Sequence, residues 1–278
     1  MSTLLHISDL HFGTEVVPVI QALLELHGQL NPELVILSGD VTQRAKPEEF
    51  ALARLFLNEL KPRQLLALPG NHDIPLFRVW ERVMSPYSLY KNALGEDLEP
   101  CFESDDVLAV GVNTTRPQRW EDGEISFEQI QRVTERLERS KGDQLRIVVT
   151  HHPVHIVATQ DRKNLVHNGD AAVHAWTAAG ADLFLGGHIH LPYVRPLSEH
   201  HLDLVRPSWV VQAGTGTSGR VRGNIPNSVN VIRFNAPGDD DIARTCIVER
   251  WDFDSPCSAF KPVEQGTLTL GSDAASSR

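Results

Sequence analysis

The chain has 278 residues, 41% of them hydrophobic and 22% charged, a composition that is typical of globular proteins and excludes a largely disordered chain. Its formal net charge is −10, from 26 Lys and Arg residues against 36 Asp and Glu residues, which argues against non-specific binding to nucleic acid or to an anionic membrane. No apolar run in the sequence approaches the roughly 20 residues that a membrane-spanning helix needs.

The N-terminal part of the chain alternates between predicted strands and helices. Apolar runs and helical periodicity predict a strand at 4–8, a helix at 16–30, a strand at 34–38, a helix at 47–60 and a strand at 65–68. This β-α-β-α-β order is typical of a parallel sheet, because parallel strands need a crossover connection between them. The carboxyl ends of such strands meet at one edge of the sheet, where crevices form.

The segment 75–106 interrupts this pattern, and we expect it to be a cap over a site or a dimerisation surface. Beyond it, the sequence predicts a strand at 107–112, a helix at 126–139 with Ser126 as its N-cap, a strand at 146–150, a helix at 170–179 and a strand at 182–185. The β-rich stretches 209–213, 227–234 and 242–252 are expected to be antiparallel strands that complete a second sheet. Residues 1–265 therefore form one predicted domain, followed by a flexible tail at 266–278.

Five short clusters of metal-type ligands occur along the chain, and each follows a predicted strand. They are Asp9-Leu10-His11, Gly39-Asp40, Gly70-Asn71-His72-Asp73, His151-His152 and Gly187-His188-Ile189-His190. The intervals from Asp9 to Asp40 and from Asp40 to Asn71 are both 31 residues, close to the length of one βαβ unit. The clusters are therefore expected at the same edge of a sheet.

Taken singly, each cluster has an ordinary structural explanation. Gly-Asp is a common turn dipeptide, a lone Asp-x-His is more often structural than metal-binding, and a single histidine is usually a hydrogen-bonded residue of the core or surface. Five clusters in order, each after a strand, would require five independent coincidences. The conjunction therefore favours a centre for more than one metal ion. Because His151 and His152 face opposite ways on an extended segment, only one of them is expected to bind metal.

Together, Asp-x-His, Gly-Asp, Gly-Asn-His-Asp, His and Gly-His-x-His, which span residues 9–190, resemble the motifs of the calcineurin-like metallophosphoesterase superfamily. The stretches ISDLHFG and LPGNHD are similar to those of its class III cyclic-nucleotide phosphodiesterase and glycerophosphodiesterase group. The resemblance implies an α/β fold, namely a four-layer αββα sandwich of two mixed β-sheets flanked by helices. It also implies two divalent or trivalent metal ions, and the mixed oxygen and nitrogen ligands suit iron, manganese or zinc.

Carried over onto this chain, the resemblance implies a role for each ligand. The first metal is expected on Asp9, His11 and His190, and the second on Asn71, His151 and His188. Asp40 would bridge the two metals, and His72 would face the phosphate and the leaving oxygen from outside the metal shell. Two cations about 4 Å apart would clamp a phosphate, a metal-bound hydroxide would attack phosphorus, and His72 would stabilise the charge or protonate the leaving group. Asp73 is expected to orient His72 or a ligand.

Polar residues on neighbouring loops are candidates for substrate contacts. Arg44 follows Asp40 by four residues, and Asn113 and Arg116 follow the predicted strand at 107–112. An arginine at the site suits a phosphate or a second anionic group, although these arginines fit a solvated surface equally well. His152 is a further candidate, for which a structural role is also open.

These expectations favour a dinuclear metal phosphodiesterase that hydrolyses a small substrate such as a cyclic nucleotide or a glycerophosphodiester. A phosphomonoesterase or a nucleotide pyrophosphohydrolase is the nearest alternative, because the metal centre does not determine how many ester bonds the phosphate carries. A non-catalytic scaffold with the same fold is an alternative of another class. Because Asp9 is already a ligand, no cleavable signal peptide fits before it, and we expect a cytoplasmic protein. A nucleic-acid or membrane partner is not expected, and a homodimer is left open.

Overall fold

The computed structural model describes residues 1–236 and 244–271, which form two six-stranded sheets with helices on their outer faces. The first sheet has the strand order β12-β11-β10-β1-β2-β3. Its strands are β1 (Ser2–Ile7), β2 (Leu34–Leu37), β3 (Leu65–Ala67), β10 (Ser228–Phe234), β11 (Thr245–Asp254) and β12 (Ala259–Thr269). The sheet is mixed, because β1, β2 and β3 are parallel whereas β10, β11 and β12 pair antiparallel with their neighbours.

The second sheet has the strand order β4-β5-β6-β7-β9-β8 and is also mixed. Its strands are β4 (Cys101–Glu103), β5 (Val107–Gly111), β6 (Leu145–Val149), β7 (Leu183–Gly186), β8 (Tyr193–Pro196) and β9 (Trp209–Gln212). The four central strands β5, β6, β7 and β9 are parallel, and the edge strands β4 and β8 are antiparallel. Every residue of β5, β6 and β7 is buried, as expected for parallel strands covered on both faces.

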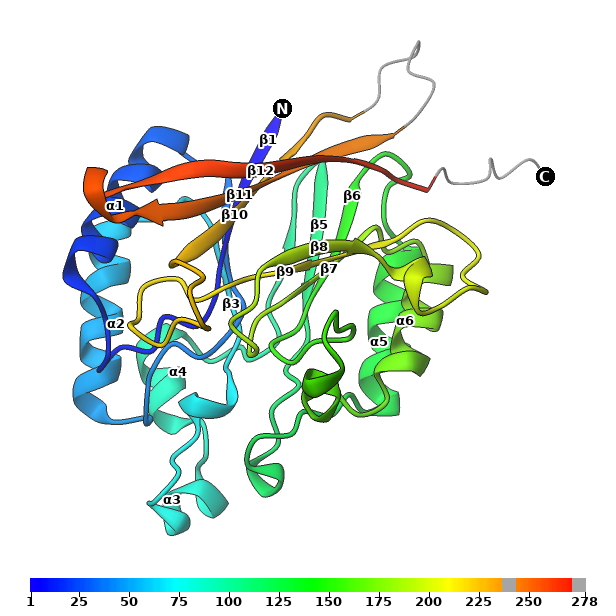
Figure 1. The fold of residues 1–278 in the computed structure, drawn as a ribbon. Coiled ribbons are helices and arrows are strands. Elements are labelled where there is room, and N and C mark those ends of the chain that lie inside the picture. Colours follow the sequence, from blue (N-terminus) through cyan, green and yellow to red (C-terminus); the bar gives the residue numbers. More distant parts are fainter. Residues whose placement is uncertain (237–243, 272–278) are drawn as a thin grey trace.

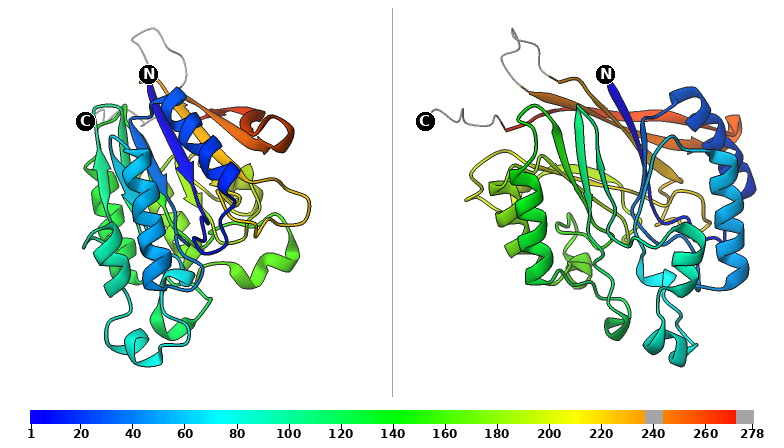
Figure 2. Two further views of the ribbon diagram at one scale, coloured as in Figure 1. Left: turned by 90° about the vertical axis from the view of Figure 1, so that its left-hand side faces the viewer. Right: turned by 180° about the vertical axis from the view of Figure 1, so that it is seen from behind.

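Helices cover both outer faces, which confirms the four-layer αββα sandwich. Figure 1 shows α1 (Val17–Leu30) and α2 (Pro47–Leu60) on one side of the two sheets and α5 (Phe127–Glu138) and α6 (Gly169–Ala178) on the other, and Figure 2 shows the same layers from two further directions. The predicted cap of α5 is confirmed: Ser126 Oγ accepts from the Gln129 amide at 3.2 Å, and Gln129 Oε1 accepts from the Ser126 amide at 2.8 Å. This reciprocal capping box satisfies amide groups that the first helical turn leaves unpaired.

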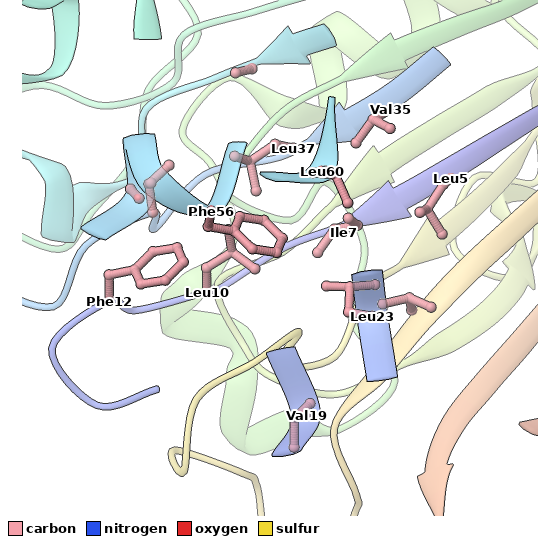
Figure 3. Packing of buried hydrophobic residues seen from close by; sticks show 14 of the residues in the cluster. Leu5, Ile7, Leu10, Phe12, Val19, Leu23, Val35, Leu37, Phe56 and Leu60 are labelled. Atoms are coloured by element: carbon pink, nitrogen blue, oxygen red, sulfur yellow. The ribbon is translucent and has the colours of Figure 1, made fainter. Parts of the chain in front are cut away.

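Three apolar layers hold the sandwich together. On β1, Leu5 and Ile7 point toward α1 and α2 (Figure 3), whereas Leu4 packs between the two sheets. Behind the second sheet, Leu108 of β5 packs with Trp176 of α6 in the third layer. Each fully buried large apolar side chain contributes roughly 1.5–3 kcal/mol. Because the parallel strands β2, β5, β6 and β7 are buried along their whole length, the positions of their ends are fixed.

The carboxyl ends of β1, β2, β3, β6 and β7 meet at one edge of the sandwich, opposite the N-terminus in Figure 1, and this edge is named the ligand edge. Backbone hydrogen bonds continue past the strand ends: the Asp9 amide donates to the Gly39 carbonyl and the His11 amide to the Asp40 carbonyl, both at 3.0 Å. In the second sheet, the Gly187 amide donates to the His151 carbonyl at 3.0 Å. The first residues of these loops are therefore held almost as firmly as the strands.

The segment 75–106 contains α3 (Val79–Met84), α4 (Ser88–Leu94) and β4. Tyr90 of α4 is buried against Phe50 of α2, and β4 forms the edge of the second sheet beside β5. Residues 75–84, named the α3 projection, extend away from the sandwich next to the ligand edge (Figure 1). Within the segment expected to be a cap or dimerisation surface, the α3 projection is thus the part that stands out from the fold.

Two expectations about the C-terminal part of the chain are wrong. The strands β10 and β11 do not complete the second sheet but extend the first sheet antiparallel to β1, and β9 joins the second sheet parallel to β7. Strand pairing is non-local, and alternation within a strand carries no information about its partner. The flexible tail was expected from residue 266, but β12 pairs with β11 as far as Thr269, and the remainder from residue 272 lies outside the described residues.

Among the described residues, every helix is too short or too polar to cross a lipid bilayer.

Candidate metal centre

Side chains from the five loops of the ligand edge converge on one site, as the order of the motifs predicts. Asp9 and His11 follow β1, Asp40 follows β2, Asn71 begins the 3₁₀ turn after β3, His151 follows β6, and His188 and His190 follow β7. These seven donors form two groups that share Asp40.

The first group consists of Asp9, His11 and His190. The Nε2 atoms of His11 and His190 lie 3.1 Å apart, and His190 Nε2 lies 3.2 Å from Asp9 Oδ1. His11 Nε2 lies 3.7 Å from the same carboxylate oxygen. An ion with bonds of about 2.1 Å places adjacent ligand atoms roughly 3.0–3.4 Å apart, so the three donors fit around one cation.

The second group consists of Asn71, His151 and His188. Asn71 Oδ1 lies 3.2 Å from His151 Nε2 and 3.0 Å from His188 Nδ1. The Asp40 carboxylate stands between the groups, with Oδ1 at 3.4 Å from His151 Nε2 and Oδ2 at 3.7 Å from His11 Nε2. A carboxylate with one oxygen toward each group has the geometry of a bridging ligand.

Backbone carbonyls select the ring nitrogens that face the site. His151 Nδ1 donates to the Ser38 carbonyl at 2.8 Å, and His190 Nδ1 donates to the Arg220 carbonyl at 2.6 Å. In a neutral imidazole the other nitrogen, Nε2, then carries the lone pair. Such partners behind a ligand set its tautomer and ring orientation, so both rings are prepared to bind a cation.

Burial controls the charge of several donors. It lowers the pKa of His11 and of His188 to about 3, so both rings are neutral, which is the form that ligates a metal. Burial alone would raise the pKa of Asp9, but the adjacent His190 outweighs it and holds this pKa below its usual range. In the same way, His151 and His72 hold the pKa of the buried Asp40 well below its usual range. Both carboxylates are therefore ionised.

The backbone of the ligand loops is strained. Five of the seven donors have a positive φ, which L-residues avoid at a cost of roughly 1–2 kcal/mol each. The values are 54° for Asp9, 46° for His11, 50° for Asp40, 72° for His188 and 55° for His190. Two glycines of the motifs are explained by close approach, because a Cβ on Gly70 would overlap the Asp40 carboxylate and a Cβ on Gly187 would overlap Ser8.

Asp73 orients the ligand loops rather than the His72 ring. Its buried carboxylate accepts from the amides of Thr42 at 2.8 Å, Gly70 at 2.9 Å and Val41 at 3.0 Å, and from the Thr42 hydroxyl at 2.8 Å. These bonds tie the loop that carries Asp40 to the turn that carries Asn71. The expectation that Asp73 orients a ligand is met in this sense, because it positions two of them through the backbone.

His72 lies beside the first donor group, close enough to His11 and Asp40 that the three could also share an ion. Its ring is 4.9 Å from the His11 ring between centroids and nearly perpendicular to it. Its Nδ1 donates to the Gln43 carbonyl at 2.8 Å, and its amide donates to Asp40 Oδ1 at 2.8 Å. The Nε2 atom is left facing the site.

A cavity of about 390 Å³ opens onto this centre. Its lining includes Arg44, Asn71, His72 and residues 119–122. Of the predicted substrate contacts, Arg44 does line the cavity, where its guanidinium lies over the ring of Phe77 at 5.9 Å. Trp120, Glu121 and Asp122 were not predicted, since sequence reasoning assigned no role to this loop.

The other three predicted substrate contacts, Asn113, Arg116 and His152, do not line this cavity. Asn113 is buried, and its Oδ1 accepts from Thr115, while the Arg116 guanidinium donates to the carbonyls of Asn113 and Thr115 and to Gln129. These groups bond to one another instead of facing the cavity. The sequence located the loop correctly after β5 but carried no signal for the direction of its side chains.

His152 is fully buried, and both of its ring nitrogens are occupied. Nε2 donates to the Glu121 carbonyl at 2.9 Å, and Nδ1 accepts from the Thr114 hydroxyl at 2.7 Å. His152 does approach His151 and His188 closely enough to resemble a third donor group, but no lone pair remains for a cation. The prediction that only one of the two adjacent histidines can bind metal agrees with this arrangement, and His152 instead supports the loop that lines the cavity.

Arg220 is a residue of the site that sequence reasoning missed. Its Nη1 lies 3.2 Å from His72 Nε2, 3.4 Å from His11 Nδ1 and 3.1 Å from Gln43 Oε1. Arg220 belongs to the glycine-rich stretch after β9, and β9 is parallel to β7, so this loop also emerges at the ligand edge. Recognising the stretch Gly-Thr-Gly-Thr-Ser-Gly-Arg as a loop after a parallel strand would have found it.

The ligand set and the fold together define a metal-dependent phosphoesterase, and the family comparison agrees. The family model for calcineurin-like phosphoesterases matches residues 2–192, so the chain belongs to this family. Over 81 residues the chain is 37% identical to the glycerophosphodiester phosphodiesterase GpdQ of Enterobacter lignolyticus. That match covers 25% of this chain and only 29% of the length of that protein.

Two solved structures share the whole fold. A dimetal phosphatase from Danio rerio superposes with a TM-score of 0.65 at 15% identity, and the alignment covers 97% of this chain and 99% of that one. A purple acid phosphatase from yellow lupin seeds superposes with a TM-score of 0.67 at 11% identity, covering 98% of this chain and 54% of that one. The expected fold class and family are thus confirmed. Members of this family depend on two metal ions, and the described residues supply matching donors.

Proposed function

We propose that this protein is a dinuclear metal-dependent phosphodiesterase that hydrolyses a small substrate, such as a cyclic nucleotide or a glycerophosphodiester. The observation that carries the proposal is the pair of donor groups joined by Asp40, whose two carboxylate oxygens face His11 and His151. Paired metals suit phosphoester hydrolysis because they stabilise both the attacking and the leaving oxygen of an in-line displacement.

Each donor has a role in this proposal. Asp9, His11 and His190 hold one ion, and Asn71, His151 and His188 hold the other. When bound, iron, manganese or zinc ions would activate a water molecule and neutralise charge on the phosphate. His72 presents Nε2 to the same space and would stabilise or protonate the leaving oxygen. Arg44 at the cavity wall would bind an anionic part of the substrate.

The choice of a diester substrate is supported by the partial match to a glycerophosphodiester phosphodiesterase and by the cavity volume of about 390 Å³, which suits a small molecule. The nearest alternative is a phosphomonoesterase or nucleotide pyrophosphohydrolase. It is favoured by the two phosphatases that share the fold, although likeness at 11–15% identity concerns the fold alone.

A non-catalytic scaffold is the alternative of another class. A scaffold has no need to retain buried, strained ligands, and all seven donors and His72 are present here with their supporting hydrogen bonds. Retained strain at a site is typical of a chemical function. The ligand set therefore favours an enzyme.

The deciding experiment compares the initial rates on bis(p-nitrophenyl) phosphate and p-nitrophenyl phosphate. The protein is stripped with a chelator and reloaded with manganese, zinc or iron, and the Asp40→Ala variant serves as the control for contaminating activity. We expect faster turnover of the diester. A clear preference for the monoester would overturn the diester assignment, and a metal-loaded protein inactive on both compounds and on a panel of natural phosphoesters would favour the scaffold.

A further inference from the structure

Arg220 places a positive charge beside His72 and beside His11 of the first donor group. One nitrogen, Nη1, makes the three side-chain contacts that Arg220 has within the described residues, at 3.1 Å to Gln43 Oε1, 3.2 Å to His72 Nε2 and 3.4 Å to His11 Nδ1. For Nη2 and Nε of Arg220, the described part of the chain provides no hydrogen-bond partner. These two nitrogens of the guanidinium can therefore donate hydrogen bonds to a ligand.

The contact with His11 cannot persist when His11 binds a cation. A neutral imidazole that ligates through Nε2 carries its proton on Nδ1. The Nδ1–H of His11 and the N–H of Arg220 would then be two donors facing each other at 3.4 Å. An acceptor that draws the guanidinium away from His11 Nδ1 removes this conflict, and an anionic oxygen is the acceptor that a guanidinium binds most strongly.

The loop that carries Arg220 is held in place from both sides. The Gly216 amide donates to the Ser8 carbonyl at 2.8 Å, and the Thr217 hydroxyl donates to the Leu10 carbonyl at 3.0 Å. Beyond Arg220, the Arg222 guanidinium pairs with Asp161 at 2.9 Å. The Arg220 carbonyl itself accepts from His190 Nδ1. A donor on such a loop is preorganised, and preorganised donors stabilise charge most effectively.

We propose that Arg220 is a catalytic residue that donates hydrogen bonds to the non-bridging oxygens of the substrate phosphate and stabilises the charge that develops on them. The inference rests on the proposed phosphoesterase function. On substrate binding, the guanidinium exchanges its contacts with His11 and His72 for phosphate oxygens. No covalent bond to Arg220 forms, and its charge is unchanged throughout. The planar fork matters, because it can reach two oxygens at once where a lysine ammonium acts as a point charge.

The test compares wild type with Arg220→Ala, Arg220→Lys and Arg54→Ala. Arg54 is an exposed arginine of α2, so its variant controls for the loss of an arginine as such. We expect Arg220→Ala to lower kcat about 100- to 1000-fold with little change in KM. We expect it to weaken binding of orthophosphate to the metal-loaded protein about 10- to 100-fold by calorimetry. Arg220→Lys should fall between Arg220→Ala and wild type, and Arg54→Ala should match wild type.

Two further measurements separate catalysis from structure. The metal content of Arg220→Ala should stay at that of wild type, because the group that supports His190 is the backbone carbonyl and not the side chain. Added guanidinium ion should restore part of the activity of Arg220→Ala, and it should leave Arg54→Ala unaffected.

Three outcomes would overturn the inference: an unchanged kcat, an unchanged orthophosphate affinity, or loss of metal from Arg220→Ala, which would make the residue structural. If wild type hydrolyses no phosphoester but its orthophosphate binding still depends on Arg220, the proposed function fails and the anion-binding role of Arg220 stands.

Discussion

The ligand edge and the α3 projection lie side by side, yet they are built in opposite ways. Asp9 and His151 are fully buried, with hydrogen bonds or donor contacts at every polar atom that faces the site, whereas Phe77 and Trp80 are 81% and 76% exposed. The strand ends of the two sheets fix the geometry of the ligand edge, whereas neither sheet supports the α3 projection. The difference teaches that the reaction is fixed by the sheets and that contacts with the rest of a substrate or partner are left to the projecting loops.

A few specific contacts hold the α3 projection to its neighbour, the loop at residues 117–122. The Arg82 side chain donates to the carbonyls of Pro117 at 2.7 Å and Pro75 at 3.1 Å, and its guanidinium lies 4.6 Å from the Trp120 ring centre. Trp120 lines the cavity, so the projection is linked to the mouth of the site. Substitutions in the two regions should therefore differ sharply in what they change.

Asp40→Ala is expected to have the largest effect. It removes the donor that faces both groups and leaves His11 and His151 without their shared carboxylate. Activity should fall to the detection limit, and most bound metal should be lost. Elemental analysis of the purified variant beside the rate assay checks both, and a variant that still holds two ions per chain would refute the bridging role.

His72→Ala tests whether chemistry and metal binding are separate within the ligand edge. The ring contacts Gln43 and Arg220 but belongs to neither donor group that we assign to an ion. We expect turnover to fall about 100- to 10,000-fold, the usual contribution of a positioned acid or base. The metal content should not change. If the variant lost one ion, His72 would be a ligand and the separation drawn here would be wrong.

Asp73→Asn tests whether the hydrogen bonds that the Asp73 carboxylate accepts stabilise the loops that carry the metal donors. The substitution keeps the shape but turns an amide NH₂ toward amides that now donate to a carboxylate, among them those of Thr42 and Gly70. We expect the metal-free protein to lose roughly 2–4 kcal/mol of unfolding free energy in urea. Metal affinity should weaken about 10- to 100-fold. If the unfolding free energy and the metal affinity were both unchanged, the ligand loops would not need the hydrogen bonds of Asp73.

Trp80→Ala is the matching change in the α3 projection and should have the smallest effect. Because the side chain is 76% exposed, the free energy of unfolding should change by no more than about 0.5 kcal/mol. Thermal melts of wild type and variant at several protein concentrations provide the measurement. A melting temperature that rises with concentration in wild type and not in Trp80→Ala would instead show that a second copy covers this face.

The convergence of the proposed metal donors was predictable from the sequence because each is fixed by its distance from a strand end. Asp9, Asp40 and Asn71 directly follow recognisable apolar strands, and the strand ends meet at one edge whatever the details of packing. The order of those motifs was therefore enough to predict which of these side chains converge at the site. The four layers were predictable for the same reason, through the family that the motifs resemble.

The features that the sequence did not predict depend on distant partners. His152 was a candidate for substrate binding, but Thr114 and Glu121 occupy its ring, and neither contact is visible in local sequence. Arg220 was missed because β9 was assigned an antiparallel pairing, which would have sent its loop to the other edge. Side-chain direction and strand pairing are set by tertiary contacts, and the pattern of a single segment does not encode them.

The most direct test of the central claim is a crystal structure of the protein loaded with manganese or zinc, with the ions located by anomalous scattering. The account predicts two peaks about 3.5–4 Å apart, with the Asp40 carboxylate between them and His72 bound to neither. A single peak, or two peaks that do not share Asp40, would contradict it.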